Sequence, residues 1–263
     1  MTNIETQQIL INHGLLDPPA DGLWGAQCRA ALEDFQSMHQ LPVTGQLDDA
    51  TYSLLKEAPV SQINLGADIA SKIISFMLKQ NYFISRGPNR YNIVYLEGAN
   101  ADGTLNNDAF NEWNDVRFVI EIPENTPKIV GKWLATTEPG ATYTFNPMNP
   151  GGAFRIAVGQ YRAWRFGRHG RTQYPALVQC GEISGYRDKN QDGKRTGDPF
   201  VTGDNFGVNQ HHGWDMQFID NASAGCLVGK SIEGHQDFME ILRGDSPKGI
   251  PSDRRYQLTS SPA

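Results

Sequence analysis

The sequence predicts an α+β protein in which a small three-helix domain precedes a mainly β domain with peripheral helices. Apolar residues recur at helical spacing over the first 58 positions, and β-branched and aromatic runs dominate from Tyr91 onward. The 27 Gly and 15 Pro residues supply the many turns that a β-rich body needs. A chain of 263 residues can form two cores. We therefore expect a helical domain at 1–58, a linker at 59–66 and a second domain at 67–263.

Composition narrows the class of function. The chain is 39% hydrophobic and 20% charged, which is typical of a globular protein, and its net charge of −6 argues against a nucleic-acid partner. The three cysteines have no metal-binding spacing, and their odd number leaves at least one free thiol. The longest apolar-rich run, 69–78, is too short to span a bilayer, so we expect no transmembrane segment. No cofactor is expected.

The elements follow from local patterns. Helices are predicted at Ile4–His13, at Cys28–His39, from a cap at Asp48 or Asp49 through Leu55, and from a cap at Asp68 to about Asn81. Strands are predicted at Tyr91–Leu96, at Arg117–Ile122, at Lys128–Leu134 as a hairpin return, at Phe154–Phe166 and at Ala176–Gln179. A helix at Ile232–Arg243, closed by Gly244, and a polar tail at Ser252–Ala263 follow.

The candidate chemistry lies between Phe206 and Gly229. Two histidines, His211 and His212, precede Gly213, and Cys226 follows among small residues. A thiol is a nucleophile as the thiolate, which a nearby imidazole generates most often. Because neighbouring residues on a strand face opposite sides, only one of the two histidines can meet the sulfur. The small residues before Cys226 would let backbone N–H groups approach a substrate carbonyl, as an oxyanion hole requires.

This segment resembles the active-site signature of the YkuD-type L,D-transpeptidases, in which a strand His-Gly precedes a Ser/Thr-His-Gly-Cys motif. The resemblance implies a β-sandwich catalytic domain with Cys226 as nucleophile, Ser223 and Gly225 as motif positions, and His211 or His212 as base. Ala224 stands where the motif has its second histidine, and the spacer is shorter than usual. His212 directly precedes Gly213, as the motif has it, whereas His211 gives the longer spacing to Cys226, closer to the family's, which favours His211. A-T-T-E-P-G at 135–140 is similar to a motif that precedes the next strand in that fold.

Four further residues are candidates for substrate contact. Arg162 and Trp164 on the Phe154–Phe166 segment could line a groove, where an arginine would suit a carboxylate-bearing peptide. His169 could approach the site from a polar loop, and Gly213 belongs to the His-Gly motif. Solvated side chains on an outer strand face are the alternative for this strand.

The first 58 residues resemble the peptidoglycan-binding type-1 domain. The order D-G-L-W-G, R-A-A-L-E-D-F-Q and L-P-V-T-G-Q-L-D-D-A-T follows that family's pattern over almost the whole segment. Asp21, Gly22, Gly25, Gln36 and Gly45 occupy its expected places. The resemblance implies peptidoglycan, both glycan strands and stem peptides, as the partner. It also implies a location in the cell wall, the periplasm or the medium. Because M-T-N-I-E-T-Q-Q has no secretory pattern, such a location requires a trimmed leader or another export route.

Three alternatives remain open. The same cysteine site could use water as acceptor, as in a lysin or a secreted toxin. His169, His211, His212 and Cys226 could instead bind zinc for hydrolysis. The second domain could also be inactive, which would leave a wall-binding protein. Separately, Asp188–Asp198 resembles part of a calcium loop, with candidate ligands Asp188, Asn190, Asp192 and Asp198, although an Asx-rich turn explains the same residues.

Overall fold

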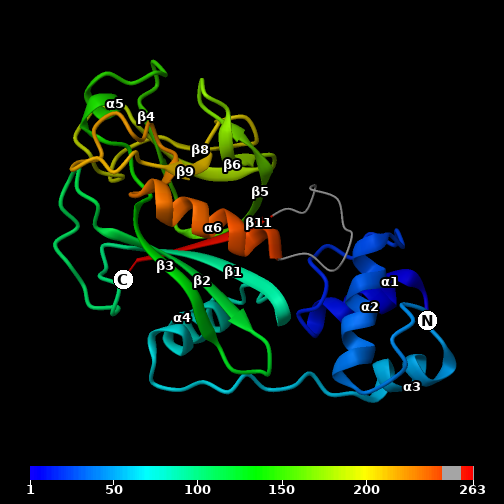
Figure 1. The fold of residues 1–263 in the computed structure, drawn as a ribbon. Helices are drawn as coiled ribbons and strands as arrows, with labels where there is room; N and C mark the ends of the chain where they lie inside the picture. The colour runs from blue at the N-terminus through cyan, green and yellow to red at the C-terminus, as the bar shows by residue number, and fades with distance from the viewer. Residues whose placement is uncertain (245–255, 263) are drawn as a thin grey trace. The chain divides into compact units, whose positions relative to one another are not determined.

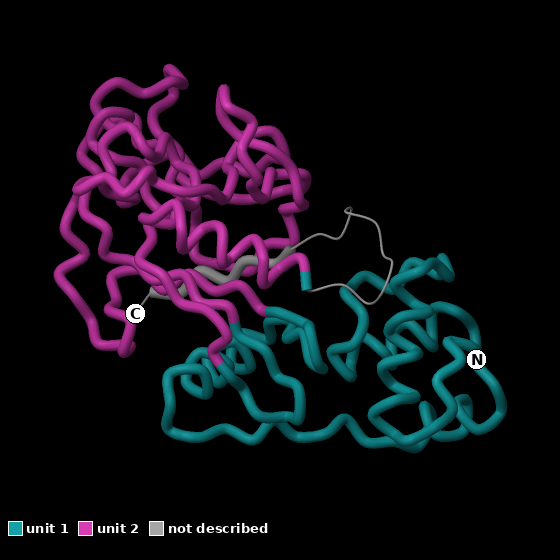
Figure 2. Tube along the Cα trace, in the orientation of Figure 1, with its two compact units in different colours: residues 1–91, 120–128, 244–250 teal, residues 92–119, 129–243, 251–263 magenta. Residues whose placement is uncertain are grey.

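The computed structural model describes residues 1–244 and the backbone of 256–262. The chain forms two compact units (Figure 2), of which the first contains Met1–Tyr91 and Ile120–Lys128 and the second contains Asn92–Val119 and Ile129–Arg243. The α+β class is confirmed, with helices at the N-terminus and a mainly β part after them (Figure 1). The expected boundaries at 58 and 66 stay a prediction.

Three helices form the N-terminal core, as the apolar spacing predicted. They are α1 (Asn3–Asn12), α2 (Ala26–Met38) and α3 (Asp49–Glu57). Side-chain hydrogen bonds cap the N-termini of two of these helices. Thr2 forms a capping box with Glu5 at the start of α1, and Asp48 accepts the N–H of Thr51 at the start of α3. The buried apolar residues of this core are Leu10, Leu15, Leu16, Cys28, Ala31, Leu32, Phe35 and Leu55.

Gln36 organises the polar part of this domain. Its side chain is fully buried, and its Nε2 donates to the carbonyl oxygen of Gln46 (2.9 Å) and to the Thr51 hydroxyl (3.0 Å). Its Oε1 accepts the N–H groups of Thr44 and Gly45, both at 2.9 Å. One amide therefore ties α2 to the following turn and to α3, which explains why the motif requires a glutamine there.

The rest of the first unit includes α4 (Ile69–Lys79). Asp68 accepts the N–H of Ser71 at 3.0 Å and so caps this helix, as predicted. In the segment before α4, the N–H of Asn64 donates to the Asn125 carbonyl (2.7 Å), and the Ser61 carbonyl accepts Arg86 Nη2 (2.6 Å).

Eight strands close into a barrel in the order β1-β11-β5-β6-β9-β10-β3-β2. The resemblance implied a sandwich of packed sheets, so the barrel is a correction to that detail. Closure leaves no free edge in the main sheet. The strands are β1 (Gly87–Glu97), β2 (Asp115–Ile122), β3 (Lys128–Thr136), β5 (Gly159–His169), β6 (Tyr174–Gln179), β9 (Gln210–His212), β10 (Leu227–Gly229) and β11 (Tyr256–Pro262).

A separate three-stranded sheet has the order β4-β7-β8. Its strands are β4 (Ala153–Ile156), β7 (Ile183–Asp188) and β8 (Phe200–Gly203). The single strand predicted at Phe154–Phe166 is therefore wrong, since the chain leaves this sheet after Ile156 and enters the barrel at Gly159. The T-T-E-P-G motif is followed by a short helix, α5 (Ala141–Phe145), rather than by a strand.

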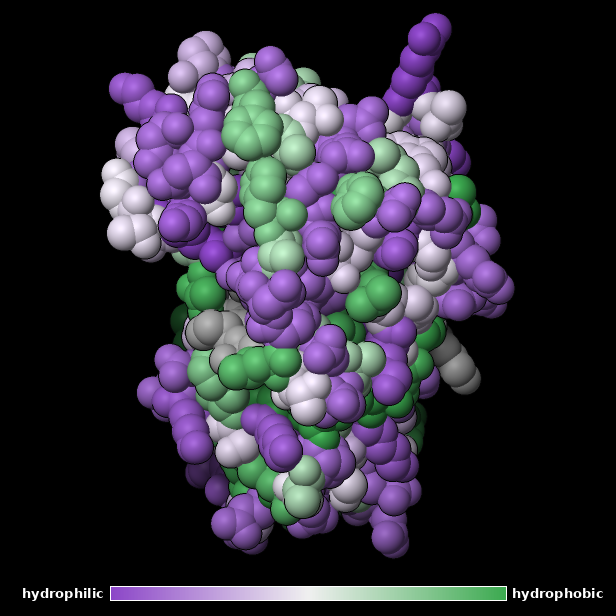
Figure 3. All heavy atoms as spheres, turned by 90° about the vertical axis from the view of Figure 1, so that its left-hand side faces the viewer, coloured by the Kyte–Doolittle hydropathy of each residue, from purple (hydrophilic) through white to green (hydrophobic). Residues whose placement is uncertain are grey.

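The last described helix is α6 (Ile232–Gly244), which matches the prediction. The polar tail at Ser252–Ala263 is partly wrong, because Tyr256–Pro262 forms β11 and pairs with both β1 and β5. Residues 252–255 and 263 lie outside the described residues. Figure 3 shows one face of the molecule, with hydrophobic side chains scattered among hydrophilic ones. Within 1–244, no helix has the length and apolar character needed to cross a membrane.

Replacing Gln36 with alanine should lower the free energy of unfolding of the helical domain by about 2–4 kcal/mol, because buried backbone N–H groups lose their acceptor. Hydrogen exchange over residues 3–57 of the intact chain measures this value. Gln8 is exposed and bonds only Asn12, so Gln8→Ala is the matched control and should cost under about 0.5 kcal/mol. Equal effects of the two substitutions would contradict the role of Gln36.

Candidate functional site

The parallel pairing of β9 and β10 positions the candidate site. Gln210 lies opposite Leu227, and His211 lies opposite Val228. Cys226 directly precedes β10, so it comes level with Asn209, whose N–H donates to Cys226 Sγ at 3.4 Å. The N–H of Leu227 bonds the Asn209 carbonyl at 2.9 Å. The backbone ladder thus places the sulfur at the end of the strand that carries both histidines.

A tight turn presents the sulfur. The Ser223 hydroxyl donates to the Cys226 carbonyl (2.9 Å) and accepts the Gly225 N–H (3.1 Å). Gly225 has a φ of +120°, and a Cβ there would collide with the carbonyl oxygen of Phe154, so only glycine fits. Ser223 is fully buried, and the N–H of Gly225 is already bonded. These two residues therefore build the turn, and Gly225 also lines the cavity beside Cys226. A direct role of Ser223 or Gly225 in catalysis stays a prediction.

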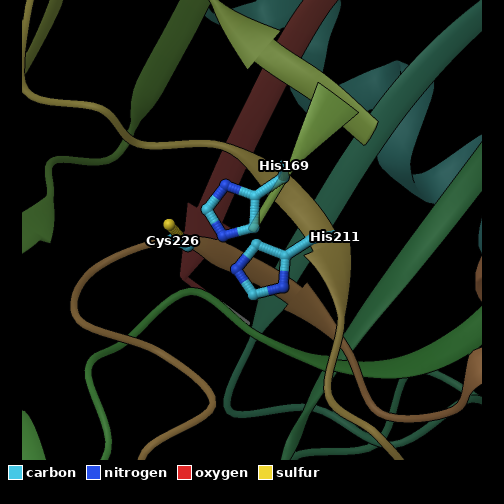
Figure 4. Close-up of side chains that lie close together, drawn as sticks. All are labelled: His169, His211 and Cys226. Carbon is cyan, nitrogen blue, oxygen red and sulfur yellow. The ribbon is translucent and has the colours of Figure 1, made fainter. Parts of the chain in front are cut away.

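The side chains of His169, His211 and Cys226 lie close together (Figure 4). One nitrogen of His169, one nitrogen of His211 and Cys226 Sγ all lie within 4.8 Å of one another. The two imidazole rings are stacked, with centroids 4.3 Å apart and planes at 10°. His212 is outside this group and packs against the Tyr174 ring, with centroids 4.3 Å apart. The structure thus brings His211, rather than its neighbour, to the thiol.

Hydrogen bonds determine which ring nitrogens carry protons. Asn209 Oδ1 accepts the N–H of Gln179 (2.9 Å), which leaves its Nδ2 as the donor to His169 Nδ1 (2.8 Å). A neutral His169 therefore holds its proton on Nε2. His211 is the reverse, because its Nδ1 lies 2.9 Å from the His212 carbonyl oxygen and must donate. The free lone pair of His211 is on Nε2, and Figure 4 shows a nitrogen of each ring on the side of the sulfur.

Burial keeps the site uncharged in the free protein. It lowers the pKa of His211 to about 3, and the adjacent His169 ring lowers this pKa further. Burial also lowers the pKa of His169. The pKa of the Cys226 thiol rises to about 11 for the same reason, although the Asn209 N–H opposes the increase. At neutral pH the site therefore holds a thiol and two neutral imidazoles.

The same hydrogen bonds test whether these residues fit zinc. A histidine that binds a metal donates its other ring N–H to an acceptor. His211 meets this requirement, whereas His169 does not, because its Nδ1 accepts from Asn209. Among the described residues the group has no carboxylate, and His212 lies outside it. The donor set does not fit a zinc site.

The group lines a cavity of about 780 Å³. Trp164 was expected to line a groove, but it is fully buried, and its Nε1 donates to the Val208 carbonyl at 2.7 Å. Arg162 is not among the residues that line this cavity. Gly213 is needed for packing, because a Cβ there would collide with the Trp113 ring. None of these three residues lines the cavity, whereas His169 does, and their contact with a substrate stays a prediction.

Sequence reasoning missed several cavity residues. Asn209 sits one position before Gln210 in the same N-Q-H-H run, so its nearness to the histidines was the available signal. Arg187, Phe206 and Trp214 also line the cavity. Phe206 and Trp214 belong to the 206–229 segment that carries the candidate chemistry, whereas Arg187 comes from a separate strand whose approach to Cys226 no local pattern predicts.

The Asp188–Asp198 loop is largely bonded to itself. Polar atoms of Asp188, Asp192 and Asp198 lie within 4.8 Å of one another. Asp188 accepts the N–H groups of Asp192 (3.2 Å) and Gly193 (3.0 Å), and it also faces Arg155 Nε at 3.4 Å. Asn190 Nδ2 donates to Asp192 at 2.9 Å. These bonds are those of an Asx-rich turn, and calcium binding stays a prediction.

The N-terminal resemblance is confirmed by comparison with known families. Residues 4–55 match the family model described as "Putative peptidoglycan binding domain". The curated "Putative OxPP cycle protein OpcA" of Nostoc punctiforme is 42% identical over 53 residues, which are 20% of this chain and 11% of that protein. The alignment thus spans about a ninth of the relative.

One solved structure aligns with most of this chain, but with low sequence identity and a low TM-score. It is a fused Zn-dependent amidase/peptidase/peptidoglycan-binding domain-containing protein from Clostridium acetobutylicum, 16% identical, with 98% of this chain and 94% of that chain covered and a TM-score of 0.31. A TM-score this low does not demonstrate a shared fold, and the zinc belongs to that protein. The family match at residues 4–55 supports a cell-wall association for this chain.

Proposed function

We propose that this protein binds peptidoglycan through residues 4–55 and modifies its stem peptides through an acyl-enzyme on Cys226. The observation that carries the catalytic part is the pairing of a thiol with an imidazole whose Nε2 lone pair is free, because His211 Nδ1 is committed to the His212 carbonyl. The cavity of about 780 Å³ around them has room for a peptide segment. The wall-binding domain would raise the local substrate concentration by tethering.

In the first step Cys226 Sγ attacks the carbonyl carbon of a stem-peptide amide, forming a C–S bond, while the thiol proton passes to His211 Nε2. The C–N bond then breaks, and His211 returns that proton to the leaving amine. Because both groups are neutral beforehand, proton transfer accompanies C–S bond formation. In the second step an amine or water attacks the thioester, loses its proton through His211, and releases the thiol.

His169 has a separate role in this proposal. Its Nε2–H is a donor, and we assign it to stabilising negative charge on the sulfur or on the carbonyl oxygen, together with the N–H of Cys226. Asn209 acts through His169 as a positioning residue. A proton on His211 is also disfavoured by the adjacent His169 ring, which promotes its return to the leaving amine.

The acceptor decides between the candidate reactions. An amine from a neighbouring stem would give an L,D-transpeptidase, as the YkuD-type resemblance implies, and water would give a carboxypeptidase or endopeptidase. A lysin or a secreted toxin would use the same site with water. In the remaining alternative the protein binds the wall but catalyses no reaction at Cys226.

Cys226→Ala should lower turnover on purified wall sacculi by about 10³-fold or more, and His211→Gln by about 10²–10⁴-fold. Mass spectrometry of the released muropeptides gives the rate and separates crosslinked dimers from shortened stems. His212→Gln is the matched control, because it changes the neighbouring imidazole, and it should stay within about tenfold of wild type. A fully active Cys226→Ala variant would refute the thiol mechanism. Sacculus pull-down should be equal for all variants.

The ionisation of Cys226 predicts a distinctive pH dependence. With its pKa raised to about 11, the rate of alkylation by iodoacetamide should rise about tenfold per pH unit from pH 7 to 10. Peptide mapping measures this rate at Cys226 alone. The same peptide in urea-unfolded protein should level off above about pH 9, near the ordinary thiol pKa. A rate that is already constant from about pH 5 would indicate a thiolate–imidazolium pair instead.

The position of the proton on His169 predicts how zinc affinity can be changed. Asn209→Asp replaces a donor with an acceptor, which should move the His169 proton to Nδ1 and free Nε2 for a metal. Zinc should then bind about 10-fold or more tightly than it does to wild type, as measured by competition with a chromogenic chelator. Asn209→Ala, which supplies no acceptor, is the control. Tight stoichiometric zinc in the wild-type protein would overturn the tautomer assignment.

A further inference from the structure

The cavity around Cys226 is lined by a positively charged side chain, that of Arg187. Arg187, on β7, lines this cavity, and no described residue that lines it is an aspartate or a glutamate. The two histidines there are neutral at pH 7, as their lowered pKa values require. A guanidinium stays charged throughout the accessible pH range. The cavity therefore carries a net positive charge that the side chains lining it do not neutralise.

The guanidinium is held in place by aromatic rings. Its central carbon lies 5.3 Å from the ring centroid of Phe154 and 5.2 Å from that of Phe206. The two rings are themselves 4.7 Å apart. Arg187 Nη1 donates to the Gly152 carbonyl at 3.3 Å, and this hydrogen bond orients one edge of the guanidinium group. Stacking of this kind orients an arginine without using its remaining N–H groups.

Phe154 connects this arginine to the nucleophile. Its ring supports Arg187, with which it is paired across β4 and β7. Its carbonyl oxygen packs so closely on Gly225 that a Cβ there would collide with it. Phe154 thus contacts both Arg187 and Gly225, the residue before Cys226, and Arg187 and Cys226 line the same cavity.

We propose that Arg187 is a specificity-determining residue that binds a carboxylate of the acyl donor beside the reacting bond. A planar guanidinium with free N–H groups matches a carboxylate bidentately, and the adjacent phenylalanine rings suit the aliphatic part of a peptide residue. Peptidoglycan stems carry free carboxylates at their ends and side chains, unlike most internal peptide segments. The inference rests on the proposed function for its substrate class, but the carboxylate site itself can be tested without turnover.

The test compares two alkylating reagents of similar size, the anion iodoacetate and the neutral iodoacetamide, on the intact protein. Peptide mapping gives the rate of each at Cys226, and their ratio reports attraction of a carboxylate. In Arg187→Gln the ratio should fall roughly tenfold while the iodoacetamide rate is unchanged, which also shows that the site is folded. Arg187→Lys keeps the charge but loses the bidentate geometry and the stacking, so it should retain only part of the ratio. Arg165→Gln removes the same charge from an exposed position on β5 and should not change it.

The substrate arm uses stem tetrapeptides with a C-terminal carboxylate or a C-terminal amide. Wild type should prefer the acid by roughly tenfold in kcat/KM, and Arg187→Gln should abolish that preference by raising KM for the acid alone. A reagent ratio within about twofold of wild type in Arg187→Gln would overturn the carboxylate site. A ratio that depends on Arg187 in a protein that turns over no stem peptide would overturn the proposed function and leave the carboxylate site standing.

Discussion

The site depends on the parallel register between β9 and β10. A parallel pair cannot be joined by a tight hairpin, so the chain must make a longer excursion between the two strands. Here residues 213–226 make it, and they return with Cys226 level with Asn209. A shift of one residue would move His211 to the opposite face, away from the sulfur. The short ladder therefore decides which of two adjacent histidines lies near the thiol.

Asn209 couples the two sides of this arrangement. Its backbone N–H reaches the sulfur, and its side chain orients His169, while Gln179 holds the amide in one orientation. An aspartate in that position would create the arrangement typical of a metal ligand. The choice of a neutral amide is thus consistent with thiol chemistry in a buried, uncharged site. The low pKa of His211 and the raised pKa of Cys226 follow from the same burial.

In the N-terminal domain, too, single buried amide side chains each bond two segments of the chain. Gln36 makes bonds to two segments from the end of α2, and Gln7 does the same near the first turn, where its Nε2 donates to Asp21 at 2.8 Å and its Oε1 accepts the Gly22 N–H at 2.7 Å. Both amides replace backbone partners that the short loops lack. A domain of this size has a small core, so such buried bonds contribute a large share of its specificity.

The sequence by itself determined the helices of the N-terminal domain, its family, the α+β class and the central segment with Cys226, because spacing, caps and motif residues are local signals. Strand alternation allowed only one of the two histidines to face the sulfur, and spacing favoured His211, but the sequence could not supply the distance. Closure of the barrel, the change of sheet after Ile156 and the burial of Trp164 depended on contacts between distant residues. The same is true of the approach of His169 to Cys226 and of the position of Arg187 in the lining of the same cavity. These residues lie far apart along the chain, and only the tertiary packing of strands and loops brings their side chains into one cavity.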